Sequence, residues 1–275
     1  MKKILPIALL LGLALSMLVF AASKVIPYFS DRKEVLDKKN DLISSAVTER
    51  DTTVEPVAPT VQERESGEEE ENVEDEPEFR EKTILNELPP ISVDFSVVGH
   101  EDAVVGWIYC ADSPINYPVA QWTDNWQFEE HDLNGVFCYE GTIYLDYRNN
   151  RRFEDFATIV YGHDMYFGHM FGCLDLYKEQ EYFDEHPYMY LLTPDKNYKI
   201  ELMYGFITKK DSFIYDLNYT KEWREQVLET AKEGTTFVSG VEGDIRDHYV
   251  LLSTCTYEFD GARYVLVGKL QRIMD

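Results

Sequence analysis

The chain has 275 residues, of which 44% are apolar and 14% aromatic, enough to build one or two domains with a hydrophobic core. Its formal net charge is −25 at pH 7, and its lysines and arginines form no basic stripe. Without such a stripe an acidic chain lacks the attraction for phosphate groups that nucleic-acid binding requires, so this class of function is excluded.

The amino-terminal segment is first basic and then apolar. Lys2 and Lys3 precede an uncharged run over residues 4–22, which is close to the length that spans a bilayer as a helix. We expect residues 1–22 to be a transmembrane anchor with its amino end in the cytoplasm, or a secretory signal peptide with a cleavage site at residues 19–21. Both alternatives place the rest of the chain on the extracellular side of the cell membrane.

Residues 23–82 are charged and poor in apolar side chains. Between Asp51 and Glu87 there are fourteen acidic and three basic residues, a net charge of −11. A block of like charge with so little apolar surface cannot offset the entropy lost on ordering. We therefore predict a largely disordered spacer over 23–82 and a folded catalytic domain over 83–275.

The folded part is predicted to be mostly β. Apolar residues between Ile84 and Val93 suggest a short amino-terminal helix followed by extended chain. Helical spacing predicts two further helices, over 170–178 and 220–232, the latter capped by Thr220 and ended by Gly234. Eight β-prone runs separated by turn residues suggest a closed barrel. The runs are 104–109, 117–121, 141–146, 157–161, 189–192, 198–207, 250–255 and 264–270.

A cysteine stands at the end of one of these predicted strands. Period-two alternation over 249–255 makes Cys255 the last residue of its strand, and a short turn leads into the next strand, which carries Arg263. A thiol and a guanidinium can therefore converge on one spot. The alternative for this pair alone is a buried structural cysteine beside a solvated arginine.

A histidine at the end of another predicted strand favours a reactive thiol. The run 157–161 ends in a glycine followed by His163, about ninety residues before Cys255. A positioned imidazole can hold the proton of a thiol or pair with its thiolate, which makes the sulfur a competent nucleophile. The chain order His, Cys, Arg also differs from papain-like enzymes, in which the cysteine comes first.

At these residues the chain resembles the sortases, and within them class B. The run 252–255, Leu-Ser-Thr-Cys, looks like the LxTC signature of that family, and His163 and Arg263 fall where its other two catalytic residues stand. The resemblance extends over about 104–273. It includes the segments 106–108, 115–119, 123–125, 141–146, 161–163, 170–171, 186–187 and 267–269, in the order that class B members show.

The resemblance implies a sortase-like eight-stranded β-barrel with an amino-terminal helix and a helix in the loop between the sixth and seventh strands. It implies a membrane-anchored cysteine transpeptidase that cleaves a carboxy-terminal sorting signal through a thioester acyl-enzyme. The cleaved protein is then transferred to an amine of the cell wall or of another protein, such as a pilin. No cofactor or metal is expected.

The expected site residues follow from the same resemblance. Cys255 is the nucleophile, His163 the general acid and base, and Arg263 the group that holds the developing oxyanion. The expected substrate-binding residues are Asp124, Phe128, Ser253 and Thr254. Core packing remains an alternative for Phe128, and so does packing for Thr254, which faces away from Cys255 by alternation.

Two other functions stay open at the level of the sequence. A tethered barrel that binds without turnover and a hydrolytic thiol protease would share most of these residues.

The other three cysteines, Cys110, Cys138 and Cys173, are expected to be small apolar side chains, although an exported protein also permits a disulfide among them.

Overall fold

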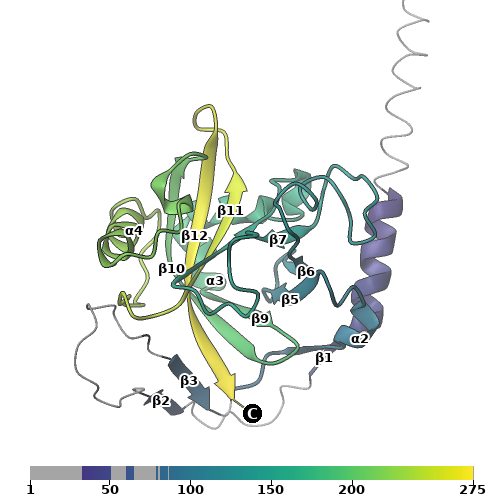
Figure 1. Ribbon diagram of the computed structural model, residues 1–275, viewed down its shortest axis with the longest axis horizontal. Coiled ribbons are helices and arrows are strands. Elements are labelled where there is room, and N and C mark those ends of the chain that lie inside the picture. The colour runs from purple at the N-terminus through teal and green to yellow at the C-terminus, as the bar shows by residue number, and fades with distance from the viewer. Residues whose placement is uncertain (1–32, 51–59, 65–78, 80, 86, 275) are drawn as a thin grey trace, which may run out of the picture. The chain divides into compact units, whose positions relative to one another are not determined.

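The computed structural model describes residues 33–50, 60–64, 79, 81–85 and 87–274. The chain separates into two compact units, Met1–Ser45 and Ala46–Asp275. The described part of the first unit is helical, and this helix covers residues 33–46. The second unit holds the β-sheet and the remaining helices, drawn from blue to yellow in Figure 1.

Eight strands of the second unit close into a barrel. Neighbouring strands follow the order β12, β10, β9, β5, β6, β7, β8 and β11, and β11 pairs with β12 to complete the circle. The prediction of an eight-stranded barrel is confirmed. The strands are β5 (Val104–Tyr109), β6 (Asn116–Ala120), β7 (Ile143–Leu145), β8 (Ala157–Tyr161), β9 (Tyr188–Leu192), β10 (Asn197–Lys209), β11 (Tyr249–Cys255) and β12 (Ala262–Met274).

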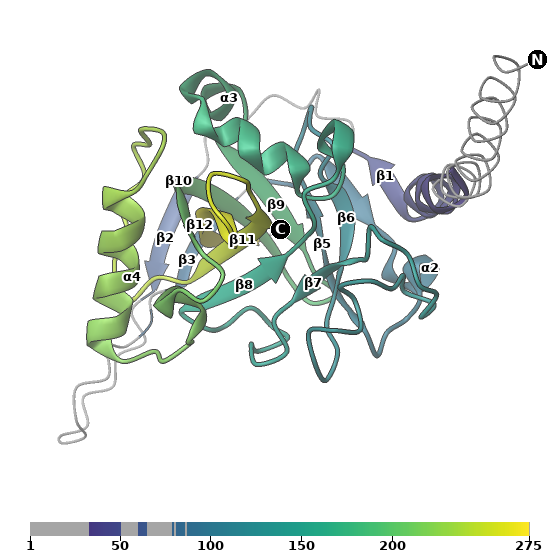
Figure 2. The same ribbon diagram turned by 90° about the horizontal axis from the view of Figure 1, so that it is seen from above.

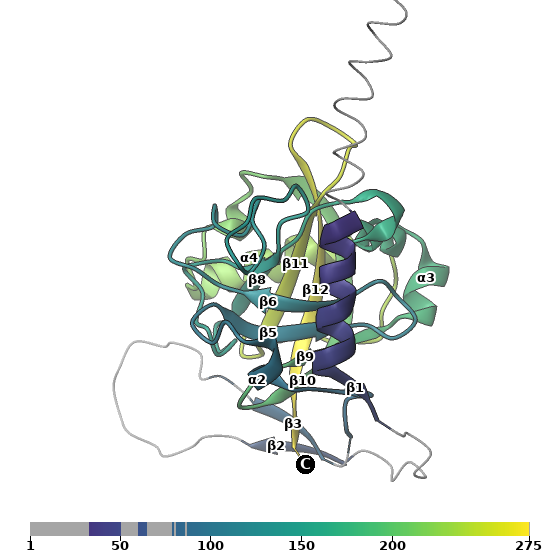
Figure 3. The ribbon, with the colours of Figure 1, turned by 90° about the vertical axis from the view of Figure 1, so that its right-hand side faces the viewer.

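The barrel is mixed in strand direction. The pairs β6–β7 and β8–β11 are parallel, and the other pairs around the circle are antiparallel. Figure 3 shows β5 and β6 crossing the long strands β11 and β12. The parallel pair β8–β11 matters for function, because it brings the carboxyl ends of two strands to the same edge of the barrel.

Strands β11 and β12 are buried on both faces, which explains their nearly continuous apolar sequence. Val250 and Leu252 belong to the cluster inside the barrel. Leu251 and Val267 belong to a second cluster, which includes buried residues of helix α4 (Lys221–Glu233). Figure 2 shows α4 and α3 (Gln180–Glu185) outside the barrel wall.

Both predicted helical insertions are present. Helix α4 begins after Thr220, whose hydroxyl accepts a hydrogen bond from the Trp223 amide, and ends at Gly234, as expected. It lies between β10 and β11, the sixth and seventh strands of the barrel. The insertion predicted over 170–178 is the 3₁₀ helix η2 (Gly172–Lys178). Two single 3₁₀ turns, η1 (Tyr166–Gly168) and η3 (Phe213–Tyr215), lie in neighbouring loops.

The amino-terminal helix is present over residues 33–46, but its predicted place between Ile84 and Val93 is wrong. Part of this stretch belongs to strand β3 (Glu81–Leu85), which pairs with the end of β12, and part to β4 (Ile91–Val93), which pairs with β1 (Val47–Glu49). The only α-helix between these strands and the barrel, in the described residues, is α2 (Phe95–Val98). Ladder hydrogen bonds to an existing sheet outweigh a weak helical pattern here.

The described parts of the predicted spacer contain regular structure, namely the helix over 33–46 and the strands β1 and β2 (Thr60–Arg64), of which β2 pairs with β3. The predicted anchor over 1–22 lies outside the described residues. Within the part of the chain that the structure covers, no helix is both long and apolar enough to cross a bilayer.

Candidate active site

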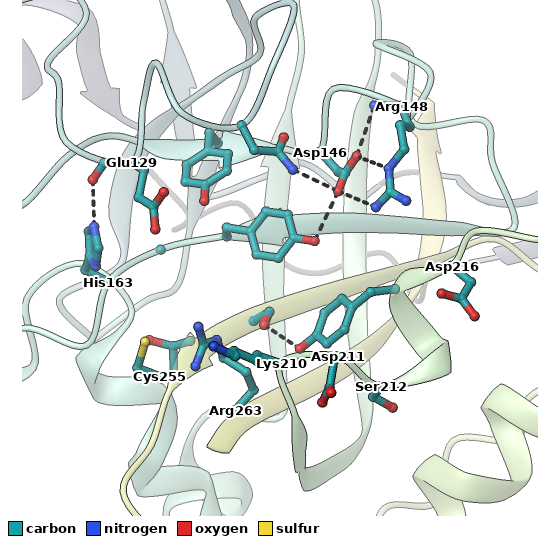
Figure 4. Close-up of a pocket in the computed structure, with 17 residues that line it drawn as sticks. Glu129, Asp146, Arg148, His163, Lys210, Asp211, Ser212, Asp216, Cys255 and Arg263 are labelled. Carbon is teal, nitrogen blue, oxygen red and sulfur yellow. Dashed lines mark hydrogen bonds and ion pairs between the residues drawn. The ribbon is translucent and has the colours of Figure 1, made fainter. Parts of the chain in front are cut away.

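Three strand ends bring the predicted catalytic residues together. Cys255 is the last residue of β11, and Arg263 stands directly opposite it on β12. His163 comes two residues after β8, which runs parallel to β11 with Tyr161 beside Ser253. All three side chains line one cavity of about 480 Å³ (Figure 4).

Gly162 allows the chain to turn from β8 into this cavity. Its amide donates to the Ser253 carbonyl at 3.2 Å, which extends the parallel ladder by one bond. A Cβ atom at this position would lie 2.7 Å from the Phe171 ring and closer still to Cδ1 of Ile143. Only glycine fits between these buried side chains, so the tight turn before His163 requires it.

His163 is held by main-chain contacts on two sides. Its Nε2 atom lies 2.6 Å from the carbonyl oxygen of Glu129, and its own carbonyl accepts a hydrogen bond from the Phe171 amide at 3.0 Å. A carbonyl oxygen can only accept, so Nε2 carries a proton in this arrangement. The nitrogen left for proton exchange is therefore Nδ1.

Cys255 differs from the other three cysteines in its exposure. All four are free thiols; Cys255 is half-buried, and Cys110, Cys138 and Cys173 are buried. Burial raises the pKa of the Cys110 thiol, and it raises the pKa of Cys138 to about 11. The three other cysteines are thus small buried side chains, as predicted, and Cys255 is the thiol that faces a cavity.

Two of the four predicted substrate-binding residues lie in this cavity. Ser253 and Thr254 both line it. The Ser253 hydroxyl is hydrogen-bonded to the hydroxyl of Tyr215 at 2.9 Å, and burial raises the pKa of Tyr215 to about 12. The Thr254 hydroxyl is buried and has no hydrogen-bond partner among the described residues.

The other two, Asp124 and Phe128, do not line the cavity. Asp124 is exposed, and its carboxylate accepts hydrogen bonds from the amides of Trp126 and Gln127. Phe128 is buried against Ala103 and Ala120, so the packing alternative describes it. Both residues shape the segment 124–129, whose Asn125 and Glu129 do reach the cavity.

The sequence reasoning missed a buried carboxylate on the cavity wall. Asp146 accepts hydrogen bonds from Nε and Nη2 of Arg148, both at 2.8 Å, and from Asn125 and the Tyr161 hydroxyl, both at 3.1 Å (Figure 4). Burial alone would raise the pKa of Asp146, but the hydrogen bonds from Arg148 outweigh it and lower the pKa. The only sequence signal was its place at the end of the segment 141–146.

The remaining lining residues give the cavity a mixed charge. Lys210, Asp211 and Asp216 come from the connection between β10 and α4, where sequence pattern alone offered no reason to select them. Within the described ranges, no three side chains of the His, Cys, Asp and Glu types are grouped as a metal site would require. The cavity therefore presents a thiol, an imidazole and a guanidinium as its chemically active groups.

Comparison with known proteins points to the same family that the sequence resembles. No family model matches the chain. The chain is 31% identical to sortase B of Listeria monocytogenes serovar 1/2a over 170 residues, which are 61% of this chain and 69% of that protein.

Solved structures resemble the fold as well. The Staphylococcus aureus sortase B–substrate complex matches with a TM-score of 0.58 at 25% identity, over 62% of this chain and 80% of that chain. A crystal structure of sortase B complexed with triglycine matches with a TM-score of 0.59 at 25% identity, over 64% of this chain and 84% of that chain.

Proposed function

This chain belongs to the sortase B family of cysteine transpeptidases, and on that premise we propose that Cys255, His163 and Arg263 carry its reaction. The enzyme cleaves a carboxy-terminal sorting signal and transfers the released acyl group to an amine. The observation that supports this assignment is that three side chains from three strand ends face one cavity of about 480 Å³, a size typical of ligand sites.

The first half-reaction forms a thioester. The thiolate of Cys255 attacks the carbonyl carbon of the scissile peptide bond, and the negative charge that develops on the carbonyl oxygen is stabilised by Arg263. His163 gives a proton to the leaving amine as the C–N bond breaks. Because Glu129 holds Nε2, Nδ1 is the nitrogen that delivers this proton.

The second half-reaction consumes the thioester. An incoming amine attacks the same carbonyl carbon, His163 takes a proton from it, and the C–S bond breaks to restore the thiolate of Cys255. Sortase B has been solved in complex with triglycine, and Staphylococcus aureus sortase B in complex with substrate. We propose by analogy a sorting-signal peptide as acyl donor, and a peptidoglycan or pilin amine as acceptor.

Ser253 and Thr254 support peptide binding by lining the cavity beside the thiol. Asp124 and Phe128 act on the substrate indirectly, since they shape the segment that carries Asn125 and Glu129.

We also propose that residues 1–22 anchor the enzyme in the cell membrane, with residues 23–82 linking this anchor to an extracellular catalytic domain over 83–275. This arrangement suits an enzyme whose substrate and acceptor both lie outside the cytoplasm.

The test is to trap and resolve the acyl-enzyme. The full chain is incubated with a sorting-signal peptide and analysed by mass spectrometry, with and without triglycine. We expect a peptide adduct on Cys255 and a triglycine-linked product. A hydrolysed product that triglycine does not alter would instead indicate a thiol protease. Binding of the peptide without any adduct or product would indicate a non-catalytic module.

A further inference from the structure

We propose that Lys178 is a positioning residue for the active site, which joins the segment carrying His163 to the loop after Cys255 and sets the charge around the thiol. The proposal rests on the proposed roles of Cys255 and His163. Lys178 ends η2 and does not line the cavity itself, so its action is indirect.

Lys178 lies at the centre of a cluster that crosses between two parts of the chain. Its ammonium lies 2.8 Å from a carboxylate oxygen of Asp175 on its own helix. It also lies 2.5 Å from Glu258 and 2.8 Å from the Thr256 hydroxyl, both in the loop between β11 and β12. The side chain is only 23% exposed and lies 5.5 Å from the centre of the Tyr264 ring.

These contacts fix the residue that follows the nucleophile. Thr256 is buried, its hydroxyl donates to Glu258 at 2.8 Å, and its amide donates to the Ala262 carbonyl at 3.2 Å. The loop that Lys178 holds is the yellow loop between β11 and β12 in Figure 1. Because Thr256 is bonded to Cys255 in the chain, movement of Thr256 displaces the thiol from its place opposite Arg263.

The same cluster reaches the segment that carries His163. Asp164 follows His163 directly, and one of its carboxylate oxygens lies so close to Gly172, the first residue of η2, that a Cβ there would be only 2.9 Å away. Burial raises the pKa of Asp164, repulsion from Asp175 raises it further, and Lys178 lowers it. Lys178 thus pairs directly with two carboxylates, those of Asp175 and Glu258, and acts on a third, that of Asp164, without contacting it.

Removing Lys178 changes the charge near the thiol in a defined direction. Without Lys178, the carboxylates of Asp175 and Glu258 lose their counter-charge, and uncompensated negative charge disfavours a thiolate and favours an imidazolium. The charged and titratable groups that face Cys255 from the other elements stay in place in such a variant. Those that line the cavity with Cys255 are Glu129, Tyr144, Asp146, Arg148, Tyr161, His163, Lys210, Asp211, Tyr215, Asp216 and Arg263, and Tyr257 of the loop lies beside them.

The test measures the rate at which iodoacetamide alkylates Cys255 in the full chain, as a function of pH, by peptide-resolved mass spectrometry. Lys178→Met keeps the length and apolar stem of the side chain and removes its charge. We expect its rate profile to move to higher pH, and a shift of about one unit would make alkylation about tenfold slower on the rising part of the profile. Lys178→Arg is expected to restore the profile.

Two further variants separate charge from folding. Glu258→Gln removes a negative charge from the same cluster, and its profile should move to lower pH, a change of sign that a loss of stability alone does not produce. Lys196→Met is the matched control. Lys196 is also mostly buried, pairs with Glu154 at 2.9 Å and lies 6.0 Å from the centre of the Tyr198 ring, away from the cavity. Its profile should match the wild type.

An unchanged profile in both Lys178→Met and Glu258→Gln would overturn the proposal, even if their melting temperatures fell. Should Lys178→Met fail to fold, Glu258→Gln decides the question, because an unchanged profile in that variant alone would then overturn the proposal. Failure of the proposed function is distinguishable, because it appears in the wild-type protein as alkylation of Cys255 without any peptide adduct.

Discussion

Cys255 and Arg263 are directly opposed residues of the antiparallel pair β11–β12. Side chains in such a pair have Cβ atoms roughly 4.5 to 5.5 Å apart on the same face of the sheet. The six residues of the connecting loop, with Gly261 in a left-handed conformation at φ 72°, close the hairpin so that this register forms. The short loop therefore places the guanidinium of Arg263 on the same face of the sheet as the thiol of Cys255.

The register leads to a prediction for Arg263. Arg263→Lys keeps the positive charge but loses the planar set of donors that can hold an oxyanion. Turnover of a sorting-signal peptide is expected to fall about 10² to 10³-fold, the usual cost of losing one such donor, while the melting temperature stays near that of the wild type.

Arg246→Lys provides the control for this experiment. Arg246 forms an ion pair with Asp244 at 2.8 Å and does not line the cavity. Its replacement is expected to leave turnover within about twofold, as exposed ion pairs contribute little. If Arg246→Lys lost activity and Arg263→Lys kept it, the oxyanion role would belong to a different arginine.

Cys255 should be the thiol that reacts with alkylating agents in the folded protein. The other three cysteines are 1% to 6% exposed, and burial raises the pKa of Cys110 and Cys138, so few of these thiols are ionised. We expect limited iodoacetamide to modify Cys255 first, and Cys255→Ala to abolish the peptide adduct. Undiminished peptide cleavage by Cys255→Ala would rule out the thiol mechanism.

The sequence predicted those parts of the site that depend on local pattern. Alternation over 249–255 located the strand end at Cys255, and a glycine after an apolar run located the turn before His163. Both depend on residues close together in the chain. The register of Arg263 followed once the two strands were recognised as a hairpin.

The parts that sequence reasoning missed depend on contacts between distant residues. The carbonyl of Glu129 is 34 residues from His163, and a main-chain group leaves no mark in the sequence. Asp146 accepts hydrogen bonds from Arg148, Asn125 and Tyr161, and this set of partners comes together only when β7 and β8 have paired. Asp124 lies outside the cavity and caps a turn, and in sequence a carboxylate that caps a turn looks like one that binds substrate.

Gly162 should be intolerant of even a methyl group. Gly162→Ala places a Cβ within 2.7 Å of the Phe171 ring and against Cδ1 of Ile143, both buried, so side chains or backbone must shift. We expect a loss of about 1 to 3 kcal/mol in the free energy of unfolding, measured by urea denaturation. Gly240→Ala is the control, since nothing lies within 4 Å of its added Cβ, and its effect should be within about 0.5 kcal/mol. Equal stability of the two variants would contradict the close approach.

Asp146 should make the barrel sensitive to acid. Its pKa is lower in the folded protein than the value of about 3.9 in an unfolded chain, so the unfolded state binds more protons as the pH falls. The stabilisation is present above about pH 4 and is lost as the pH falls through the folded-state pKa.

Asp146→Asn tests this prediction. The variant should lose about 1.5 to 3 kcal/mol of unfolding free energy at pH 7, because its hydrogen bonds from Arg148 are no longer charge-assisted. The difference from the wild type should shrink on acidification below pH 4. A difference that stays constant between pH 7 and pH 3 would show that ionisation of Asp146 is not the cause.

The last prediction concerns where the folded domain begins. A chain over 46–275 keeps every strand of the second unit and should unfold cooperatively, with alkylation of Cys255 like that of the full chain.

A chain over 83–275 also lacks β1 and β2, which pair only with β4 and β3 and take no part in closing the barrel. It also loses Ala46, which is 2% exposed, and the hydrogen bonds from Arg50 to Pro90 and from Asp94 to Ala46. We expect the shorter chain to fold with a lower midpoint of urea denaturation and the same active-site reactivity, because the eight barrel strands and their interior cluster remain whole. Loss of cooperative unfolding in the 83–275 chain, with the 46–275 chain intact, would move the boundary of the catalytic domain upstream of β1.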